Sequence, residues 1–241
     1  MSALLELSGL SRSFGALKVT DDVSLAIPEG QAVGIIGPNG AGKSTLFSLI
    51  TGTLMPDAGQ VGFVGQDVSR RPAAWRSRHG IARSFQVPQP FAGMTVFENL
   101  LTAASFGGGL AGRAAAQRAH AVLAQTHLAH RADTLAGDLT LLDRKRVELA
   151  RALATNPRLL LLDEIAGGLT DAECAQLIDI VRDIHAGGVT IVWIEHIVHA
   201  LMAVVSRLVV LDTGRVVADG PPQAVISSPA VVALYTGMAH D

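Results

Sequence analysis

A glycine-rich run holds the residues whose spacing most directly predicts chemistry. It lies between an apolar stretch that predicts a strand and a second apolar stretch that predicts a helix. Lys43 can reach the β and γ phosphates of a nucleotide, Ser44 can ligate Mg²⁺, and backbone N–H groups at the helix start can surround phosphate oxygens. The strand, loop and helix order therefore predicts a nucleoside triphosphate site and disfavours an ordinary glycine turn. The predicted binding residues are Gly37, Pro38, Asn39, Gly40, Ala41, Gly42, Lys43, Ser44 and Thr45.

Two adjacent carboxylates come later, at the end of the most apolar run. Asp163 and Glu164 follow the leucines 159–162, and an unbroken apolar run predicts a strand that is buried on both faces. Ligands of open α/β sheets bind at the carboxyl ends of such strands. Asp163 suits the Mg²⁺ shell, and Glu164 can orient and deprotonate an attacking water. The alternative is that the two acids only begin a loop; the phosphate loop upstream favours the catalytic interpretation.

Three other side chains are candidates because of where predicted elements end. Gln86 closes a predicted strand over Ile81–Gln86, and His196 follows a predicted strand over Val189–Ile194, so both are expected at the ligand edge of the sheet. Phe14 stands beside a glycine between two N-terminal strands and is a candidate platform for an adenine ring. A buried Phe at a strand end is equally compatible with its spacing.

Composition limits the class of protein. The chain has 241 residues, 49% of them hydrophobic, which suits one α/β unit with an inserted subdomain. A net charge of −2 gives no bulk attraction to nucleic acid. The single cysteine, Cys174, cannot form an internal disulfide. The N-terminus lacks a signal-peptide pattern, and the longest apolar stretch, Leu201–Leu211, is short and contains Arg207, so we expect no membrane-spanning helix.

The elements that must position these residues form an α/β pattern. Residues 4–10 and 17–27 partly alternate apolar and polar side chains, which predicts an N-terminal antiparallel β layer. An Ala- and Leu-rich segment predicts an inserted helical subdomain, and Pro88 and Pro90 predict a hinge before it. The predicted division of the single domain, residues 1–241, is a core of residues 1–86 and 157–241 and a helical insertion of residues 87–156.

Together these motifs resemble the ATP-binding subunit of ABC transporters over nearly the whole chain. Leu139–Asp143 falls where that family has its signature sequence, and Arg144–Leu153 is similar to the signature helix. The resemblance implies a P-loop NTPase fold with a parallel core sheet, an ATPase activity, and ATP and Mg²⁺ as cofactors. The implied roles are adenine stacking for Phe14, Walker A binding for residues 37–45, nucleotide contacts for Gln86 and Thr140, metal binding for Ser44, Gln86 and Asp163, and catalysis for Glu164 and His196.

Within that family, Gly80–Gln86, Met94–Leu100 and Asp219–Pro222 are similar to the ATPase subunits of branched-chain amino-acid importers. Urea, amide and lipid-exporting systems share much of this pattern, and a soluble ABC ATPase without a transport role is a further alternative. A P-loop kinase or GTPase is disfavoured because a guanine-reading motif is absent from the sequence. The resemblance implies membrane permease subunits, a second ATP-binding subunit and, indirectly, a solute-binding protein as partners, at the cytoplasmic face of the membrane.

Four positions depart from the family pattern. Leu141 and Leu142 replace the two signature glycines, Thr170 stands at the D-loop Asp with Asp171 beside it, and Ile165 replaces the usual Pro. In the family, the signature of one subunit meets the nucleotide of the other, so a leucine there can obstruct the approach of backbone to phosphate. This suggests one strong and one weak site in a heterodimer, which the turnover of Leu142→Gly would test.

Overall fold

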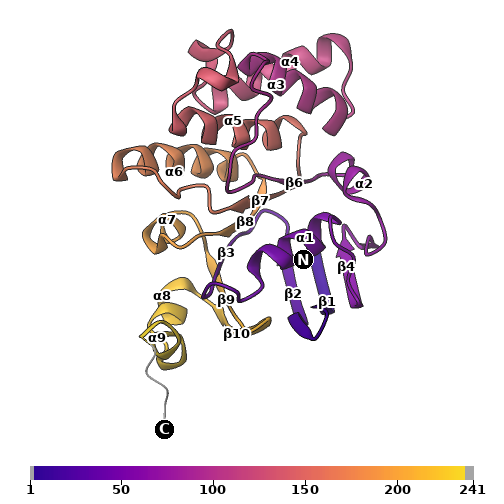
Figure 1. Cartoon of the computed structure of the whole chain (residues 1–241), viewed down its shortest axis with the longest axis vertical. Coiled ribbons are helices and arrows are strands. Elements are labelled where there is room, and N and C mark those ends of the chain that lie inside the picture. Colours follow the sequence, from indigo (N-terminus) through magenta and orange to yellow (C-terminus); the bar gives the residue numbers. More distant parts are fainter. Residues whose placement is uncertain (1–2, 237–241) are drawn as a thin grey trace. The chain divides into compact units, whose positions relative to one another are not determined.

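The computed structural model describes residues 3–236, and the chain divides into two compact units (Figure 1). Unit 1 comprises the chain up to Pro72 and from Val192 onward, and unit 2 comprises Ala73–Ile191. Strand β8, Thr190–Ile194, crosses the second boundary. The two ends of the predicted domain 1–241 lie outside the described residues.

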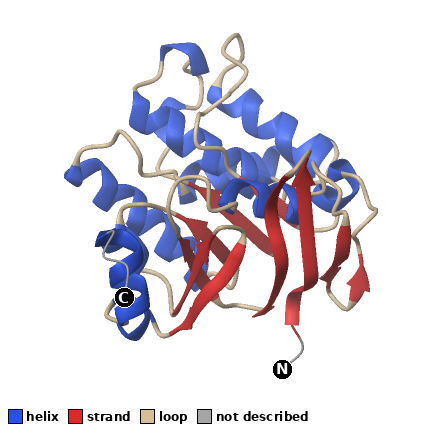
Figure 2. Ribbon diagram, turned by 60° about the horizontal axis from the view of Figure 1, so that its bottom comes forward, coloured by secondary structure: helices blue, strands red, loops and turns tan. Residues whose placement is uncertain are grey.

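Unit 1 contains the N-terminal antiparallel sheet, whose two long strands stand out in Figure 2. Leu5, Leu7 and Leu10 are buried on one face of the first strand, whereas Glu6 and Ser8 between them are exposed. This alternation packs Leu5 and Leu7 on the core and leaves Glu6 and Ser8 in water. The antiparallel pairing of β1 with β2 and β4 confirms the predicted N-terminal β layer. The strands, in the order β2-β1-β4-β5, are β1 Ala3–Phe14, β2 Leu17–Pro28, β4 Ala58–Phe63 and β5 Gln66–Asp67.

Unit 1 also contains the strands that carry the phosphate loop. All five residues of β3 are buried, and β3 pairs in parallel with β9, which forms an antiparallel hairpin with β10. Arg207 at the start of β9 pairs with Asp219 of β10 at 2.5 Å and donates to the Ala26 carbonyl. The bounds are β3 Ala32–Ile36, α1 Lys43–Thr51, α7 Val198–Met202, β9 Arg207–Asp212, β10 Arg215–Gly220, α8 Pro222–Ile226 and α9 Pro229–Thr236.

Unit 2 is mainly helical, with α3, α4 and α5 packed together (Figure 1). Strands β6 and β7 pair in parallel, and every residue of β7 is buried. The apolar face of α5 contributes Val147, Leu149 and Leu153 to the core. The bounds are α2 Ala73–Arg78, β6 Ile81–Arg83, α3 Val96–Thr102, a π-helical turn Ala103–Gly107, α4 Gly112–Gln125, α5 Leu141–Ala154, β7 Leu159–Asp163 and α6 Asp171–Ala186.

One predicted element is wrong in its extent. Strand β6 ends at Arg83, so Gln86 lies in a bend beyond the strand rather than at its last residue. One hydrogen bond to β7 follows the end of β6: the Ser84 N–H donates to the Leu161 carbonyl oxygen at 2.9 Å. Pro88 and Pro90 then supply no N–H donors, so the chain cannot continue pairing. Among residues 3–236, no helix is both long and apolar enough to cross a membrane.

Candidate functional site

The predicted phosphate loop begins where the buried strand β3 ends. At Gly37 a Cβ atom would lie 2.1 Å from the Leu211 carbonyl oxygen, so only glycine fits there. Gly42, at the start of α1, has φ 95°, and a Cβ atom on it would lie 2.3 Å from the Val19 carbonyl oxygen. The loop backbone is therefore shaped by close contacts with neighbouring strands. Its tip, Asn39 and Gly40, is exposed.

Lys43 lies folded along this loop. Its buried side chain places Nζ 2.7 Å from the Gly37 carbonyl oxygen and 3.0 Å from the Pro38 carbonyl oxygen. The ammonium group is thus held above the loop, at the N-terminal end of a nine-residue helix. Ser44 is exposed in the first turn of that helix. The loop amides, the helix end and Lys43 together present positive charge where phosphates are predicted to bind.

His196 follows β8, which neighbours β3 in the sheet. Its side chain is exposed, and its backbone N–H donates to the buried Glu195 carboxylate at 2.9 Å. Ile36, directly before the phosphate loop, and Val198, two residues after His196, line the same apolar hollow of about 260 Å³. Within unit 1, therefore, the segment after His196 adjoins the start of the phosphate loop.

Tyr235 of α9 is a neighbour of this loop that sequence reasoning missed. It lines the same apolar hollow, and the Gly37 backbone N–H donates a hydrogen bond to its hydroxyl. Partial burial raises the pKa of Tyr235 above its ordinary value, and the Gly37 hydrogen bond opposes that rise. A single tyrosine near the end of the chain carries no motif, so only the fold could reveal this contact.

Phe14 is the last residue of β1, and its side chain is 46% exposed. The Arg12 guanidinium carbon lies 5.2 Å from the centre of its ring. The alternative of a buried strand-end Phe is therefore wrong. The exposed ring is available for stacking, as the adenine prediction requires.

The remaining predicted catalytic residues lie in unit 2. Asp163 ends β7 as a buried residue, and Arg83 Nη2 lies 2.5 Å from its Oδ2. Glu164 follows with φ 47°, a conformation that non-glycine residues rarely adopt. Gln86 Nε2 donates to Glu164 Oε2 at 2.6 Å. The structure thus brings Gln86 and the predicted base Glu164 into direct contact. It also adds Arg83, which the sequence analysis did not single out.

Thr140 is the N-cap of α5, where its hydroxyl accepts from the Asp143 N–H at 3.3 Å. The two leucines after it differ sharply: Leu142 is 8% exposed and Leu141 is 47% exposed. Leu142 therefore packs within unit 2, and Leu141 presents its side chain to solvent. The hypothesis of an obstructing leucine consequently moves from Leu142 to Leu141.

Leu142→Gly is expected to lower the free energy of unfolding by about 2–5 kcal/mol, because it removes a buried side chain and leaves a cavity. Leu141→Gly is the matched control, and its expected loss is about 1 kcal/mol, the cost of glycine in a helix. Denaturant unfolding of the purified chain measures both values. Equal losses would contradict the burial difference between the two leucines.

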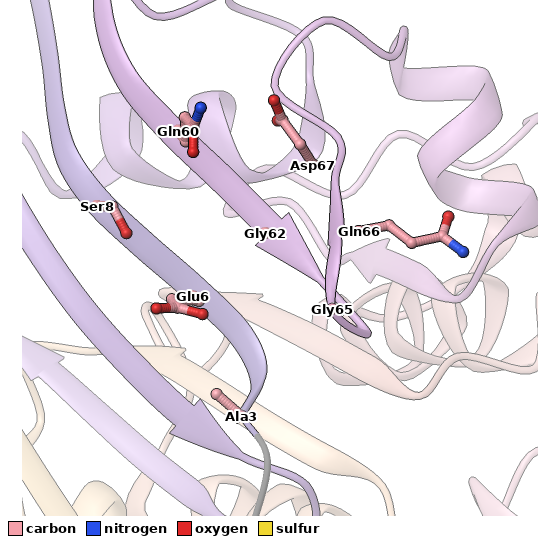
Figure 3. Close-up of a pocket in the computed structure, with 8 residues that line it drawn as sticks. All are labelled: Ala3, Glu6, Ser8, Gln60, Gly62, Gly65, Gln66 and Asp67. Atoms are coloured by element: carbon pink, nitrogen blue, oxygen red, sulfur yellow. The ribbon is translucent and has the colours of Figure 1, made fainter.

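A polar hollow of about 300 Å³ lies on the N-terminal sheet (Figure 3). Figure 3 shows Glu6 and Ser8 on β1 beside Gln60 on β4. Its lining residues are Ala3, Glu6, Ser8, Gln60, Gly62, Gly65, Gln66 and Asp67. None of them forms part of the predicted nucleotide site.

The sequence comparisons identify the family. Residues 20–167 match the family model described as ABC transporter. This chain belongs to the ABC transporter family. As an ABC ATPase subunit, it binds and hydrolyses ATP for a transporter.

Individual ABC proteins are similar over nearly the full chain. A high-affinity branched-chain amino acid transport ATP-binding protein, BraF of Pseudomonas aeruginosa, is 35% identical over 98% of both chains. The lipopolysaccharide export system ATP-binding protein LptB of Haemophilus influenzae is 32% identical over 98% of both. The ADP conformation of MJ1267, an ATP-binding cassette of an ABC transporter, superposes with a TM-score of 0.87 at 32% identity, over 98% of this chain and all of that one. The predicted α/β ABC ATPase fold is thereby confirmed.

Proposed function

We propose that this ABC ATPase powers the uptake of branched-chain and other hydrophobic amino acids through separate permease subunits. The similarity to BraF, 35% identity over 98% of both chains, is the observation that carries the proposal. Lipid export is the second candidate, because LptB is 32% identical over the same share of the chain.

In the proposed mechanism, the loop residues Gly37–Thr45 and Lys43 hold the β and γ phosphates, and Phe14 stacks on adenine. Glu164 orients and polarises the attacking water, and His196 contacts the γ phosphate. The phosphate loop and His196 belong to unit 1, whereas Gln86, Asp163 and Glu164 belong to unit 2. We propose that all of these groups act in ATP hydrolysis, and that Thr140 serves the nucleotide of the partner subunit.

Ser44, Gln86 and Asp163 are proposed to hold Mg²⁺. Their hydroxyl, amide and carboxylate oxygens are the donors that this ion prefers, and the burial of Asp163 beside Arg83 fixes the orientation of its carboxylate. Bound Mg²⁺ supplies charge neutralisation at the phosphates. In the part of the chain that the structure describes, His, Cys, Asp and Glu form no separate cluster that could hold a metal ion.

The proposed permease contact is the segment that follows β6. Its exposed apolar side chains are Phe85, Val87, Phe91 and Met94. Exposed apolar side chains gathered in one segment are typical of a protein interface. We assign residues 87–156 as the helical subdomain, which carries Val87, Phe91 and Met94 of this contact, and residues 1–86 and 157–241 as the core. The proposed assembly also contains a second ATP-binding subunit and, indirectly, a solute-binding protein, and it lies at the cytoplasmic face of the membrane.

Reconstitution in proteoliposomes tests the proposed solute. The chain is co-purified with its co-encoded permeases and solute-binding protein, and radiolabelled leucine uptake is measured with ATP at the face that carries the ATPase. We expect ATP-dependent uptake that Glu164→Gln abolishes. ATP hydrolysis without leucine uptake, combined with ATP-dependent release of lipid from the bilayer, would favour the export candidate instead.

A further inference from the structure

Helix α5 carries a lysine that contacts the backbone of Gln86 and that of Glu164, the residue proposed as catalytic base. Lys145 Nζ donates to the Gln86 carbonyl oxygen at 3.1 Å and to the Glu164 carbonyl oxygen at 3.4 Å. The lysine is 5% exposed, so its ammonium group is largely removed from water. Burying an ammonium group is costly unless it is hydrogen-bonded, so these carbonyl contacts stabilise the observed arrangement.

The two carbonyls belong to residues 78 positions apart in the sequence, and one nitrogen atom joins them. Gln86 has no strand to hold it, because β6 ends at Arg83 and prolines follow. Glu164 lies directly after the last residue of β7 and has φ 47°. Lys145 therefore fixes two backbone positions that regular secondary structure leaves unsupported. Their side chains meet in the same arrangement, at 2.6 Å between Gln86 Nε2 and Glu164 Oε2.

The same face of α5 also contacts Gln89, three residues after Gln86. Glu148 accepts from the Gln89 N–H at 3.3 Å, and Arg151 Nη1 donates to the Gln89 carbonyl at 2.7 Å. Lys145, Glu148 and Arg151 are spaced three residues apart, so they lie along one side of the helix. Burial raises the pKa of Glu148, while Arg151 and the backbone N–H groups of Gln89 and Phe85 oppose that rise.

We propose that Lys145 is a positioning residue for ATP hydrolysis, which sets the distance and orientation between Gln86 and Glu164 from the helix that follows the signature sequence. The proposal rests on the role of Glu164 as the base in the proposed function. Lys145 acts through the backbone of these two residues and has no contact with the nucleotide in this role. Its loss shifts the base while leaving the phosphate loop unchanged, so the rate of the chemical step should fall without an equal change in ATP binding.

The test compares Lys145→Met with Lys145→Arg, which retains donors, and with Arg144→Met. Arg144 is the matched control, because it is an exposed cation on the same helix whose Nη2 donates to the Gly137 carbonyl at 2.7 Å. We expect Lys145→Met to lower kcat by about 10- to 100-fold with KM for ATP changed by less than about twofold. We expect Lys145→Arg to recover most of the rate and Arg144→Met to match the wild type.

Backbone hydrogen exchange of the nucleotide-free protein provides a readout independent of activity. Faster exchange at Phe85, Gln86, Val87 and Gln89 is expected in Lys145→Met and absent in Arg144→Met. The same is expected at Gly167, whose N–H donates to the Glu164 carbonyl. If Lys145→Met does not fold, Lys145→Gln is measured in its place. Wild-type kcat and wild-type exchange in the folded variant would overturn the positioning role.

The two proposals can fail separately. A wild-type protein that hydrolyses ATP, a Glu164→Gln variant that does not, and a fully active Lys145→Met variant would overturn only the role of Lys145. A fully active Glu164→Gln variant would instead overturn the proposed catalytic mechanism.

Discussion

Glu164→Gln is expected to leave ATP binding intact and to lower the rate of ATP hydrolysis by about 10²- to 10⁴-fold, the usual contribution of a general base. The substitution keeps the size of the side chain and an oxygen that can accept from Gln86 Nε2, which lies 2.6 Å from Glu164 Oε2. It removes the negative charge that attracts the proton of the attacking water. Single-turnover hydrolysis and titration with a non-cleavable ATP analogue measure the two effects separately.

Glu173→Gln is the control for this substitution. Glu173 lies in the same unit and accepts from the Thr170 N–H at 2.9 Å in the capping box of α6. The hydrogen bonds from Thr170 lower the pKa of Glu173, so Glu173 is ionised at neutral pH. We expect its neutral variant to hydrolyse ATP at a rate within about twofold of the wild type, as for surface substitutions away from the chemistry. Equal losses of the hydrolysis rate in the two variants would contradict a catalytic role specific to Glu164.

Lys43→Met is expected to weaken ATP binding by about 100-fold, since it removes a charge-assisted contact with the phosphates. In the structure, Nζ already lies within 3.0 Å of two loop carbonyl oxygens, Gly37 and Pro38. Methionine retains the length of the buried stem without the charge. Calorimetric titration with the non-cleavable analogue and Mg²⁺ gives the dissociation constant.

Lys18→Met is the matched control, because Lys18 is a half-exposed lysine of the same unit that pairs with Asp21. Its variant should bind the analogue as tightly as the wild type, since surface ion pairs contribute little. Thermal unfolding of both variants separates a loss of binding from a loss of folded protein. Wild-type affinity in a folded Lys43→Met variant would place the triphosphate elsewhere.

The local sequence pattern predicted most of the helices and strands, because burial and backbone geometry limit which residue types each position accepts. The five buried residues of β3 and the leucines of β7 are apolar since both strands lie in the core. Gly37 and Gly42 could be identified from the motif, and the structure supplies the reason: strand carbonyls lie too close for a side chain. The extent of β6 was overestimated, because apolar residues alone do not show where pairing stops.

The sequence by itself determined the ABC family, and it predicted the phosphate loop and the acidic pair, because all of these depend on residue types at short, fixed spacing. Only the tertiary structure decided that Leu142 is buried while Leu141 is exposed, that Arg83 pairs with Asp163, and that Lys145 joins Gln86 to Glu164. These facts concern residues brought together from distant parts of the chain. Such contacts depend on how helices and strands pack, and a local sequence pattern does not predict them.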